Sequence, residues 1–290
     1  MGRNTQVLAE GLYFGEGPRW RDGRLWFSDF HAHAVKSVSL AGDVRTEVEI
    51  DDQPSGLGWT PDGELLIVSM VKRQVLVRWR DGRLGVHADL GGVADFHCND
   101  MVVDAQGRAY VGNFGFDLAA RIAARGVRGA MVDAPTARLA LVLPDGEVRV
   151  GASGLHFPNG SVITPDGRTL VVAETLANRL SAFGIGEDGA LSGRRIWALT
   201  PGPPDGIALD AAGAIWVASP AGEGCVRIAE GGEVLEAIDT GQACYACMLG
   251  GEDGRTLFML TAPPLGVDAA SAPMGKVVVA TVEVAHAGLP

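Results

Sequence analysis

The amino-acid sequence predicts an all-β fold, a six-bladed β-propeller with four-stranded antiparallel blades and a central metal site. The first observation is a turn that recurs six times, with its glycines 40, 44, 60, 46 and 41 residues apart. The second is that a short apolar run precedes and follows each turn. The third is the lack of a convincing amphipathic helix. Repeats of about 40–45 residues, each built from several short strands, are typical of propeller blades.

The repeated units are located by their turn glycines. These lie in Asp22-Gly23, Asp62-Gly63, Gln106-Gly107, Asp166-Gly167, Ala212-Gly213 and Asp253-Gly254. Runs rich in β-forming residues follow them, such as Leu25-Trp26-Phe27, and a third and fourth strand complete each unit. We expect residues 5–9, which precede the first unit, to complete the last blade and close the ring. Residues 1–290 are therefore predicted to form one domain without a linker.

The long interval between the third and fourth turns predicts an insertion at about residues 115–136, within the third blade. This segment is rich in Ala, Gly and Arg. Loops of this length are usually functional lids or mobile segments. A surface loop without a function is the alternative.

Composition limits the partners and the compartment. Of the 290 residues, 47% are hydrophobic and 20% are charged, and the net charge is −11. Without a basic cluster or a long apolar run, we expect no nucleic-acid partner and no membrane contact, only a small-molecule substrate. The cysteines Cys98, Cys225, Cys244 and Cys247 are too few for a disulfide framework, and we expect buried thiols in a cytoplasmic protein.

The residue seven or eight positions before each turn glycine predicts the functional site. These slots hold Glu16, Ser55, Asn99, Asn159, Asp205 and Ala246. In a propeller the first strand of each blade lines the central channel, so the slots face one end of one tunnel. Two carboxylates and two amides suit a hard cation. Glu16, Asn99, Asn159 and Asp205 are thus predicted to bind one divalent ion; the alternative is that polar residues simply begin strands after turns.

Ca²⁺ is the expected ion, with Mg²⁺, Mn²⁺, Zn²⁺ or Fe²⁺ also compatible with oxygen ligands. The second strand of each blade returns to the same face, so its last residues should surround the ion. We therefore expect Phe30, Asn113, Phe114 and Glu174 to contact the substrate, together with Asn99 and His97. Phe30, Phe96, Phe114, Phe116, Met70 and Phe157 are predicted to form an apolar wall.

At these residues the chain resembles the senescence-marker-protein/gluconolactonase (SMP-30/gluconolactonase/LRE-like) family of six-bladed propellers. The matching motifs are Glu16-Gly17-Pro18-Arg19-Trp20, Cys98-Asn99-Asp100, Pro158-Asn159-Gly160 and Pro204-Asp205-Gly206-Ile207. The family is known for a single divalent cation at the channel mouth, often calcium, and for hydrolysing sugar lactones. The resemblance implies that Glu16, Asn159 and Asp205 bind the metal and that Asn99 is a further ligand or a substrate contact. It also implies that Asp205 acts as the base.

One departure from the family bears on the substrate. Sugar-lactonase members usually carry an Arg two residues before the Asn99 position, and here that residue is His97. Together with the aromatic wall, this favours a lactone or related ester less polar than a sugar lactone. His97 has an intrinsic pKa suited to acid–base work at neutral pH, or it simply packs at the channel mouth.

The sequence therefore predicts a metal-dependent lactonase-type hydrolase in which Asp205, His97 and Asn99 are catalytic. Two alternatives use the same pocket. One is proton-transfer chemistry by His97 and Glu174, as in a lyase, hydratase or isomerase, and the other is hydrolysis of an organophosphate. A non-catalytic binding propeller is a third, weaker alternative.

Overall fold

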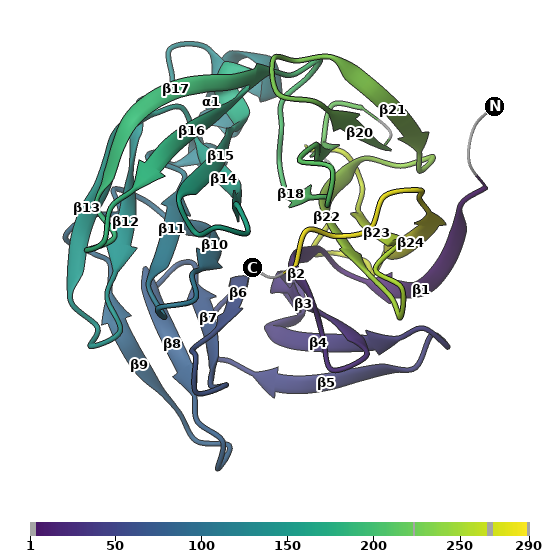
Figure 1. Ribbon diagram of the computed structural model, residues 1–290, viewed down its shortest axis with the longest axis horizontal. Helices are drawn as coiled ribbons and strands as arrows, with labels where there is room; N and C mark the ends of the chain where they lie inside the picture. The colour runs from purple at the N-terminus through teal and green to yellow at the C-terminus, as the bar shows by residue number, and fades with distance from the viewer. Residues whose placement is uncertain (1–3, 223, 266–268, 289–290) are drawn as a thin grey trace.

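Six four-stranded antiparallel sheets form a ring around a central channel in the computed structural model (Figure 1), which describes residues 4–222, 224–265 and 269–288. Blade one holds β2 (Gly15–Arg21), β3 (Arg24–Asp29), β4 (Ala34–Ser39) and β5 (Val44–Glu49). Blade two holds β6 (Pro54–Trp59), β7 (Leu65–Ser69), β8 (Gln74–Arg78) and β9 (Leu84–Asp89). Blade three holds β10 (Cys98–Val103), β11 (Ala109–Asn113), β12 (Ala137–Val142) and β13 (Val148–Leu155).

The other three blades repeat this order. Blade four holds β14 (Pro158–Ile163), β15 (Thr169–Glu174), β16 (Arg179–Ile185) and β17 (Leu191–Leu199). Blade five holds β18 (Ile207–Leu209), β19 (Ile215–Ser219), β20 (Gly224–Ile228) and β21 (Val234–Asp239). Blade six holds β22 (Cys244–Gly250), β23 (Thr256–Thr261) and β24 (Gly275–Thr281), with β1 (Gln6–Leu12) as its outer strand. The predicted six-bladed fold is confirmed.

The ring is closed by pairing the start of the chain with its end. β1 pairs antiparallel with β24, and Gln6 lies opposite Val279. The prediction that residues 5–9 complete the last blade is therefore confirmed. Closure in this way ties the two ends of the chain into one sheet and joins the last blade to the first through the continuous chain from β1 to β2.

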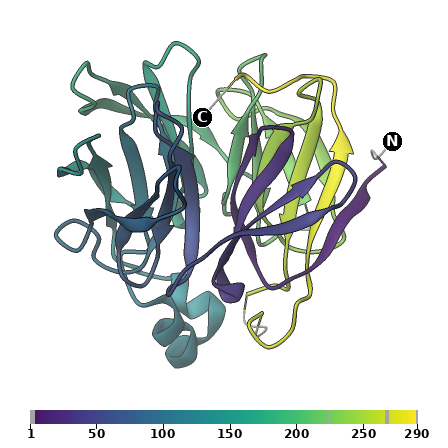
Figure 2. The same ribbon diagram turned by 90° about the horizontal axis from the view of Figure 1, so that it is seen from below.

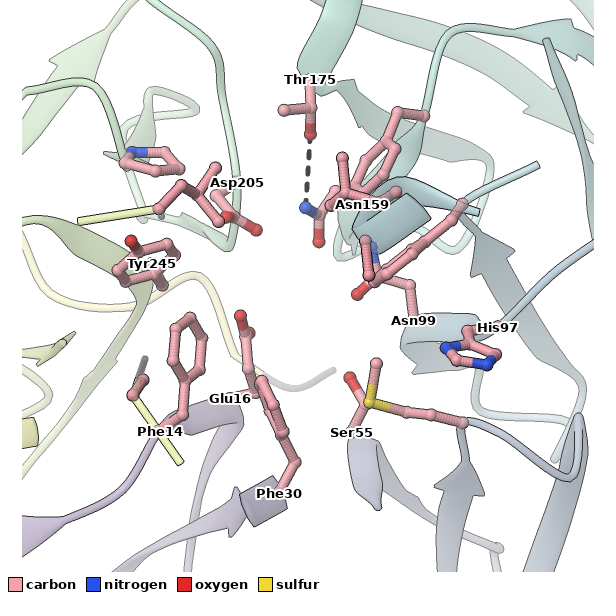
Figure 3. A pocket seen from close by; sticks show the side chains of 18 of the residues that line it. Phe14, Glu16, Phe30, Ser55, His97, Asn99, Asn159, Thr175, Asp205 and Tyr245 are labelled. Carbon is pink, nitrogen blue, oxygen red and sulfur yellow. Dashed lines mark hydrogen bonds between the residues drawn. The ribbon is translucent and has the colours of Figure 1, made fainter. Parts of the chain in front are cut away.

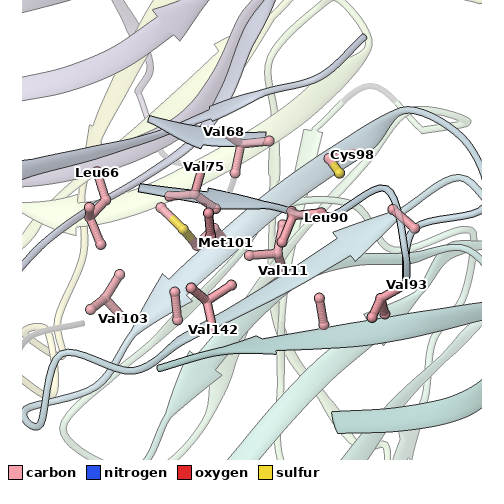
Figure 4. Packing of buried hydrophobic residues seen from close by; sticks show 14 of the residues in the cluster. Leu66, Val68, Val75, Leu90, Val93, Cys98, Met101, Val103, Val111 and Val142 are labelled. Atoms are coloured by element: carbon pink, nitrogen blue, oxygen red, sulfur yellow. The ribbon is translucent and has the colours of Figure 1, made fainter. Parts of the chain in front are cut away.

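The core lies between neighbouring blades, and the burial of each strand follows its distance from the axis. Every residue of β10 and β14 is buried, whereas most of β13 is exposed or half-buried. Between blades two and three, Val68, Met101 and Val111 belong to one apolar cluster (Figure 4). The inner strands are buried because both of their faces are covered, although their first residues include polar ones such as Asn99 and Asn159.

Two glycines allow the inner strands to approach each other closely around the channel. A Cβ atom on Gly160 would lie 2.5 Å from the carbonyl oxygen of Asp205, and one on Gly206 would lie 2.7 Å from the Cα atom of Ala246. Any larger residue would push two blades apart. The glycine that follows Asn159 or Asp205 therefore sets how near these side chains come to the axis.

The insertion in blade three contains a helix, contrary to the expectation that no convincing helix is present. Helix α1 (Leu118–Met131) begins at Asp117, whose Oδ1 accepts a hydrogen bond from the Ala120 amide at 2.8 Å, and it is kinked at Gly126. Figure 2 shows this segment, in teal, projecting from one end of the ring. The apolar residues of α1 lie on one face, as in an amphipathic helix, and the sequence analysis missed this pattern in a segment that is interrupted by Gly126. Two 3₁₀ turns, η1 (Phe30–Ala32) and η2 (Thr175–Ala177), follow the second strands of blades one and four.

All four cysteines are free and buried, as predicted. Cys225, Cys244 and Cys247 belong to the apolar cluster between blades five and six. Burial raises the pKa of the Cys225 and Cys244 thiols, so these groups are protonated packing residues. No helix among the described residues is long and apolar enough to cross a membrane.

Candidate active site and metal centre

A cavity of about 370 Å³ opens at one end of the channel, and the predicted slots form its floor. Five of the six slot residues line it: Glu16, Ser55, Asn99, Asn159 and Asp205. Each comes from the innermost strand of its blade, or from the residues just before it. Figure 3 shows these side chains directed toward a shared central space. The sixth slot, Ala246 on β22, supplies no polar atom.

The floor contains buried polar atoms without hydrogen-bond partners. These atoms are Ser55 Oγ, Asn99 Nδ2, Asn159 Oδ1 and Asp205 Oδ1. Buried polar atoms in folded proteins are almost always paired, so several unpaired ones around one point indicate a site for an ion, a water molecule or a ligand. The Asn99 amide can present its oxygen instead of its nitrogen by a flip.

The two floor carboxylates repel each other. The pKa of Glu16 is raised well above its ordinary value by burial and then by the charges of Asp205 and Asp100. The pKa of Asp205 is raised by burial and by Asp100, against a hydrogen bond from Asn159. Like charges in a desolvated site are costly, and a bound cation would remove the cost.

The orientation of Asn159 is determined by its neighbours. Its Nδ2 donates to Thr175 Oγ1 at 3.3 Å, and Thr175 Oγ1 donates to the Pro204 carbonyl oxygen at 2.8 Å (Figure 3). Because the nitrogen is used in this way, the amide oxygen is turned to the floor. Thr175 directly follows β15, at the end of a second strand, where the sequence analysis expected residues to surround the ion, and it lines the cavity.

A buried ion pair lies next to the floor. Arg19 Nη2 lies 3.6 Å from Asp100 Oδ1, and it also donates to the Met101 carbonyl oxygen. Both side chains are almost fully buried. Arg19 was quoted in the sequence analysis only as part of a motif, and its position on the third residue after Glu16 gave no sign of this contact.

The donor set fits a hard divalent cation. The described residues contain no group of three or more His, Cys, Asp or Glu side chains that could bind an ion. Two carboxylates, completed by the amide and hydroxyl groups of Asn159, Asn99 and Ser55, are the donors present. Oxygen donors of this kind suit Ca²⁺ or Mg²⁺ better than softer ions.

Aromatic residues form two walls above the floor. On one side the ring of Phe14 lies 4.6 Å from that of Phe30 and 4.4 Å from that of Tyr245. On the other side Phe114 stacks on Phe157 at 4.7 Å. Of the predicted wall, Phe30, Phe96, Phe114, Met70 and Phe157 line the cavity, whereas Phe116 lies behind Phe157 with a ring separation of 6.0 Å.

A sequence model of the SMP-30/gluconolactonase/LRE-like region matches residues 14–263, which include both the floor and the walls. The chain belongs to the SMP-30/gluconolactonase/LRE-like family. The pentonolactonase XacC of Haloferax volcanii is 28% identical over 224 residues, which cover 73% of this chain and 68% of that protein. Lactone hydrolysis is therefore represented among its relatives.

Solved structures share the fold of this family member at lower identity. Regucalcin of Agrobacterium tumefaciens, described as a calcium-binding protein, aligns with a TM-score of 0.79 at 21% identity over 100% of this chain and 96% of its own. A gluconolactonase from Xanthomonas campestris aligns with a TM-score of 0.76 at 23% identity, covering 97% of this chain and 90% of its own. These similarities establish the propeller architecture.

His97, which lies two residues before Asn99, is part of the cavity wall. Its ring stacks on that of Phe96 at 4.1 Å and lies 6.2 Å from that of Phe114, and it lines the cavity. Burial lowers its pKa, against the raising effect of Asp117 and Asp52. A neutral imidazole at this position can donate or accept one hydrogen bond at neutral pH.

Asn113 and Glu174 were expected to contact the substrate, but the structure places neither in the cavity lining. Asn113 Nδ2 donates to the Arg138 carbonyl oxygen at 2.5 Å, and its Oδ1 accepts from the Gly115 amide at 2.9 Å. Glu174 is bound by Arg179 at 2.9 Å and by Arg194 at 2.7 Å. Both side chains hold the scaffold together.

The alternation of side chains along a strand explains this correction. Asn113 and Glu174 are the last residues of β11 and β15, and the next residues, Phe114 and Thr175, line the cavity instead. Successive side chains in an extended chain point to opposite sides, so an error of one residue exchanges a scaffold position for a site position.

Proposed function

We propose that the protein is a divalent-metal-dependent hydrolase that opens a lactone, or a related ester, less polar than a sugar lactone. The observation that carries this proposal is a floor of unpartnered buried oxygen atoms beneath aromatic walls. The floor supplies ligands for a cation, and the walls supply an apolar environment for the remainder of the substrate. The lactonases among its relatives support the reaction class.

The proposed metal ligands are Glu16, Asn159 and Asp205, with Asn99 as a fourth donor. Ca²⁺ is the ion we propose, because the donors are hard oxygen atoms, and a structural relative is described as calcium-binding. When bound, such an ion supplies positive charge that polarises a carbonyl group and stabilises the oxyanion formed from it.

The remaining roles are assigned to side chains of the floor and walls. Asp205 orients the attacking water molecule and accepts its proton, because its Oδ1 has no other partner. Asn99 contacts the reacting group from the floor, and neutral His97 exchanges a hydrogen bond with the substrate from the wall. Phe30 and Phe114 pack against the apolar part of the substrate.

Metal analysis combined with a substrate panel tests this proposal. The purified protein should contain about one equivalent of a divalent ion, and chelation should abolish hydrolysis of apolar lactones until the ion is restored. Hydrolysis in ¹⁸O-labelled water should place label in the new carboxylate. A product without label in a new carboxylate would identify the proton-transfer alternative. That alternative is the less supported one, because Glu174, one of its two proposed groups, is held by arginines.

A further inference from the structure

The part of the cavity next to helix α1 differs chemically from the floor. We call it the α1 subsite and define it by Phe114, Leu118, Ile122, Met131 and Phe157, all of which line the cavity. None of these side chains carries a hydrogen-bonding group. The floor, in contrast, is formed by Glu16, Ser55, Asn99, Asn159 and Asp205, and the polar lining residue next to the α1 subsite is Asp117, whose Oδ1 caps the helix.

The wall of the α1 subsite is fixed in place, because Arg121 makes hydrogen bonds across the kinked insertion. Its Nε donates to the Ala130 carbonyl oxygen at 2.9 Å and its Nη2 to the Val132 carbonyl oxygen at 2.8 Å. The guanidinium also lies 5.3 Å from the centre of the Phe116 ring, which packs against Phe157. The helix is thus fastened to the aromatic residues behind the cavity.

The cavity contains no cation to receive an anionic group away from the floor. Among the described lining residues there is no Lys or Arg, and the charged ones are Glu16, Asp117 and Asp205. The guanidinium of Arg121 on the helix is occupied by the contacts described above. A carboxylate or a row of hydroxyl groups placed in the α1 subsite would lose its water without gaining partners, which is costly.

We propose that the α1 subsite binds a hydrocarbon substituent of a neutral lactone, with Ile122 as one wall of the space that the substituent fills. The inference rests on the proposed function, which places the lactone ring at the floor. The position of the substituent is inferred from the apolar wall alone. The cavity of about 370 Å³ equals the volume of about twelve water molecules. That volume accommodates a lactone ring together with an alkyl chain of several carbons.

Binding of unreactive analogues tests the subsite separately from the reaction. The probes are five-membered lactams that carry hydrogen, ethyl, butyl or hexyl at the ring carbon next to nitrogen, titrated calorimetrically into the Ca²⁺-loaded protein. The dissociation constant should fall about fourfold for each methylene group that enters the subsite. A carboxypropyl lactam should bind at least about tenfold more weakly than the butyl lactam of equal length.

Two variants and a matched control locate the effect at Ile122. Ile122→Trp should weaken binding of the hexyl lactam at least about tenfold, because the indole occupies the chain's volume, with the unsubstituted lactam changed less than about twofold. Ile122→Ala should move the best chain to a longer one. Ala124→Trp adds the same indole to an exposed position of α1, outside the cavity lining. It should change the dissociation constant of neither the hexyl lactam nor the unsubstituted lactam.

The outcomes separate this inference from the proposed function. If dissociation constants were independent of chain length, or if Ile122→Trp behaved like Ala124→Trp, the α1 subsite would be refuted. The same holds if polyhydroxylated lactams bound more tightly than alkyl lactams. If the lactams followed the expected series but the matching alkyl lactones were not hydrolysed, the subsite would stand and the proposed reaction would fail.

Discussion

Asp205 and Glu174 are two buried carboxylates in neighbouring blades, and their surroundings give them opposite properties. Glu174 accepts hydrogen bonds from Arg179, Arg194, Ser181 and the His156 amide. Burial raises its pKa, but these partners outweigh burial and lower the pKa to about 2. Asp205 has an oxygen without a partner and a raised pKa.

The difference separates stability from function. A carboxylate surrounded by cations is fully satisfied and stabilises the folded chain, whereas one beside other carboxylates destabilises the chain until a ligand arrives. Burial by itself therefore does not identify an active-site acid. A carboxylate oxygen without a hydrogen-bond partner does identify one. The comparison of Asp205 with Glu174 gives four predictions.

The largest expected effect is that of Asp205→Asn on activity. Loss of the proposed base and metal ligand should lower kcat/KM for an apolar lactone by at least about 10³-fold. The metal-free variant should be at least as stable as the parent protein, because one member of a repelling set has become neutral. Steady-state kinetics and urea unfolding measure the two effects. Retention of full turnover would contradict the assignment of Asp205.

Glu174→Gln should have the opposite outcome, a loss of stability with activity almost unchanged. Removing the charge leaves Arg179 and Arg194 without their partner and should cost about 2–3 kcal/mol of unfolding free energy, with kcat changed less than about twofold. Because the pKa of Glu174 is depressed, its contribution is present above the ordinary value of 4.5 and is lost as the pH falls toward about 2. The difference between the two proteins in urea unfolding should shrink accordingly.

Glu147→Gln is the matched control for Glu174→Gln. Glu147 pairs with Arg149, but both side chains are about half exposed, so the pair is well solvated. Its loss should leave the midpoint of urea unfolding unchanged within error. If the control cost as much as Glu174→Gln, the stabilising role of the buried cluster would be refuted.

Thr175→Val tests the neighbour that orients a proposed ligand. The variant removes the acceptor for Asn159 Nδ2 and keeps the shape of the side chain. The Asn159 amide is then free to turn, and Ca²⁺ affinity measured by calorimetry should fall about tenfold. The unfolding free energy without Ca²⁺ should change by about 1 kcal/mol. Unchanged affinity would show that the Asn159 orientation does not depend on Thr175.

The smallest expected effect is a pH dependence of metal stabilisation. The raised pKa values of Glu16 and Asp205 favour the metal-free folded state below their ordinary values of 4.5 and 3.8, and this advantage is lost as the pH rises through the raised values. A bound cation removes that loss. The increase in melting temperature caused by Ca²⁺ should therefore be larger at about pH 8 than at about pH 5. Asp205→Asn should reduce the difference.

The ring and the floor of the site were predictable from the sequence because they depend on local spacing. Glu16 precedes its turn glycine by seven residues, and Asn99, Asn159 and Asp205 precede theirs by eight. The register between the first and second strands of a blade follows from that spacing, and the position of the first strand beside the channel follows from the repeat.

Only the tertiary structure decided which residues next to the floor belong to the cavity. Whether Glu174 or Thr175 faces the cavity depends on one step of alternation at a strand end, and the partners of Glu174 include Arg194 from another strand. The position of helix α1 likewise depends on packing: its apolar face becomes a cavity wall because Arg121 lies over the Phe116 ring, which packs against Phe157. Spacing along the chain determined the floor, and contacts between distant segments determined the walls. A sequence pattern encodes periodicity, but it does not encode which distant side chains will contact each other.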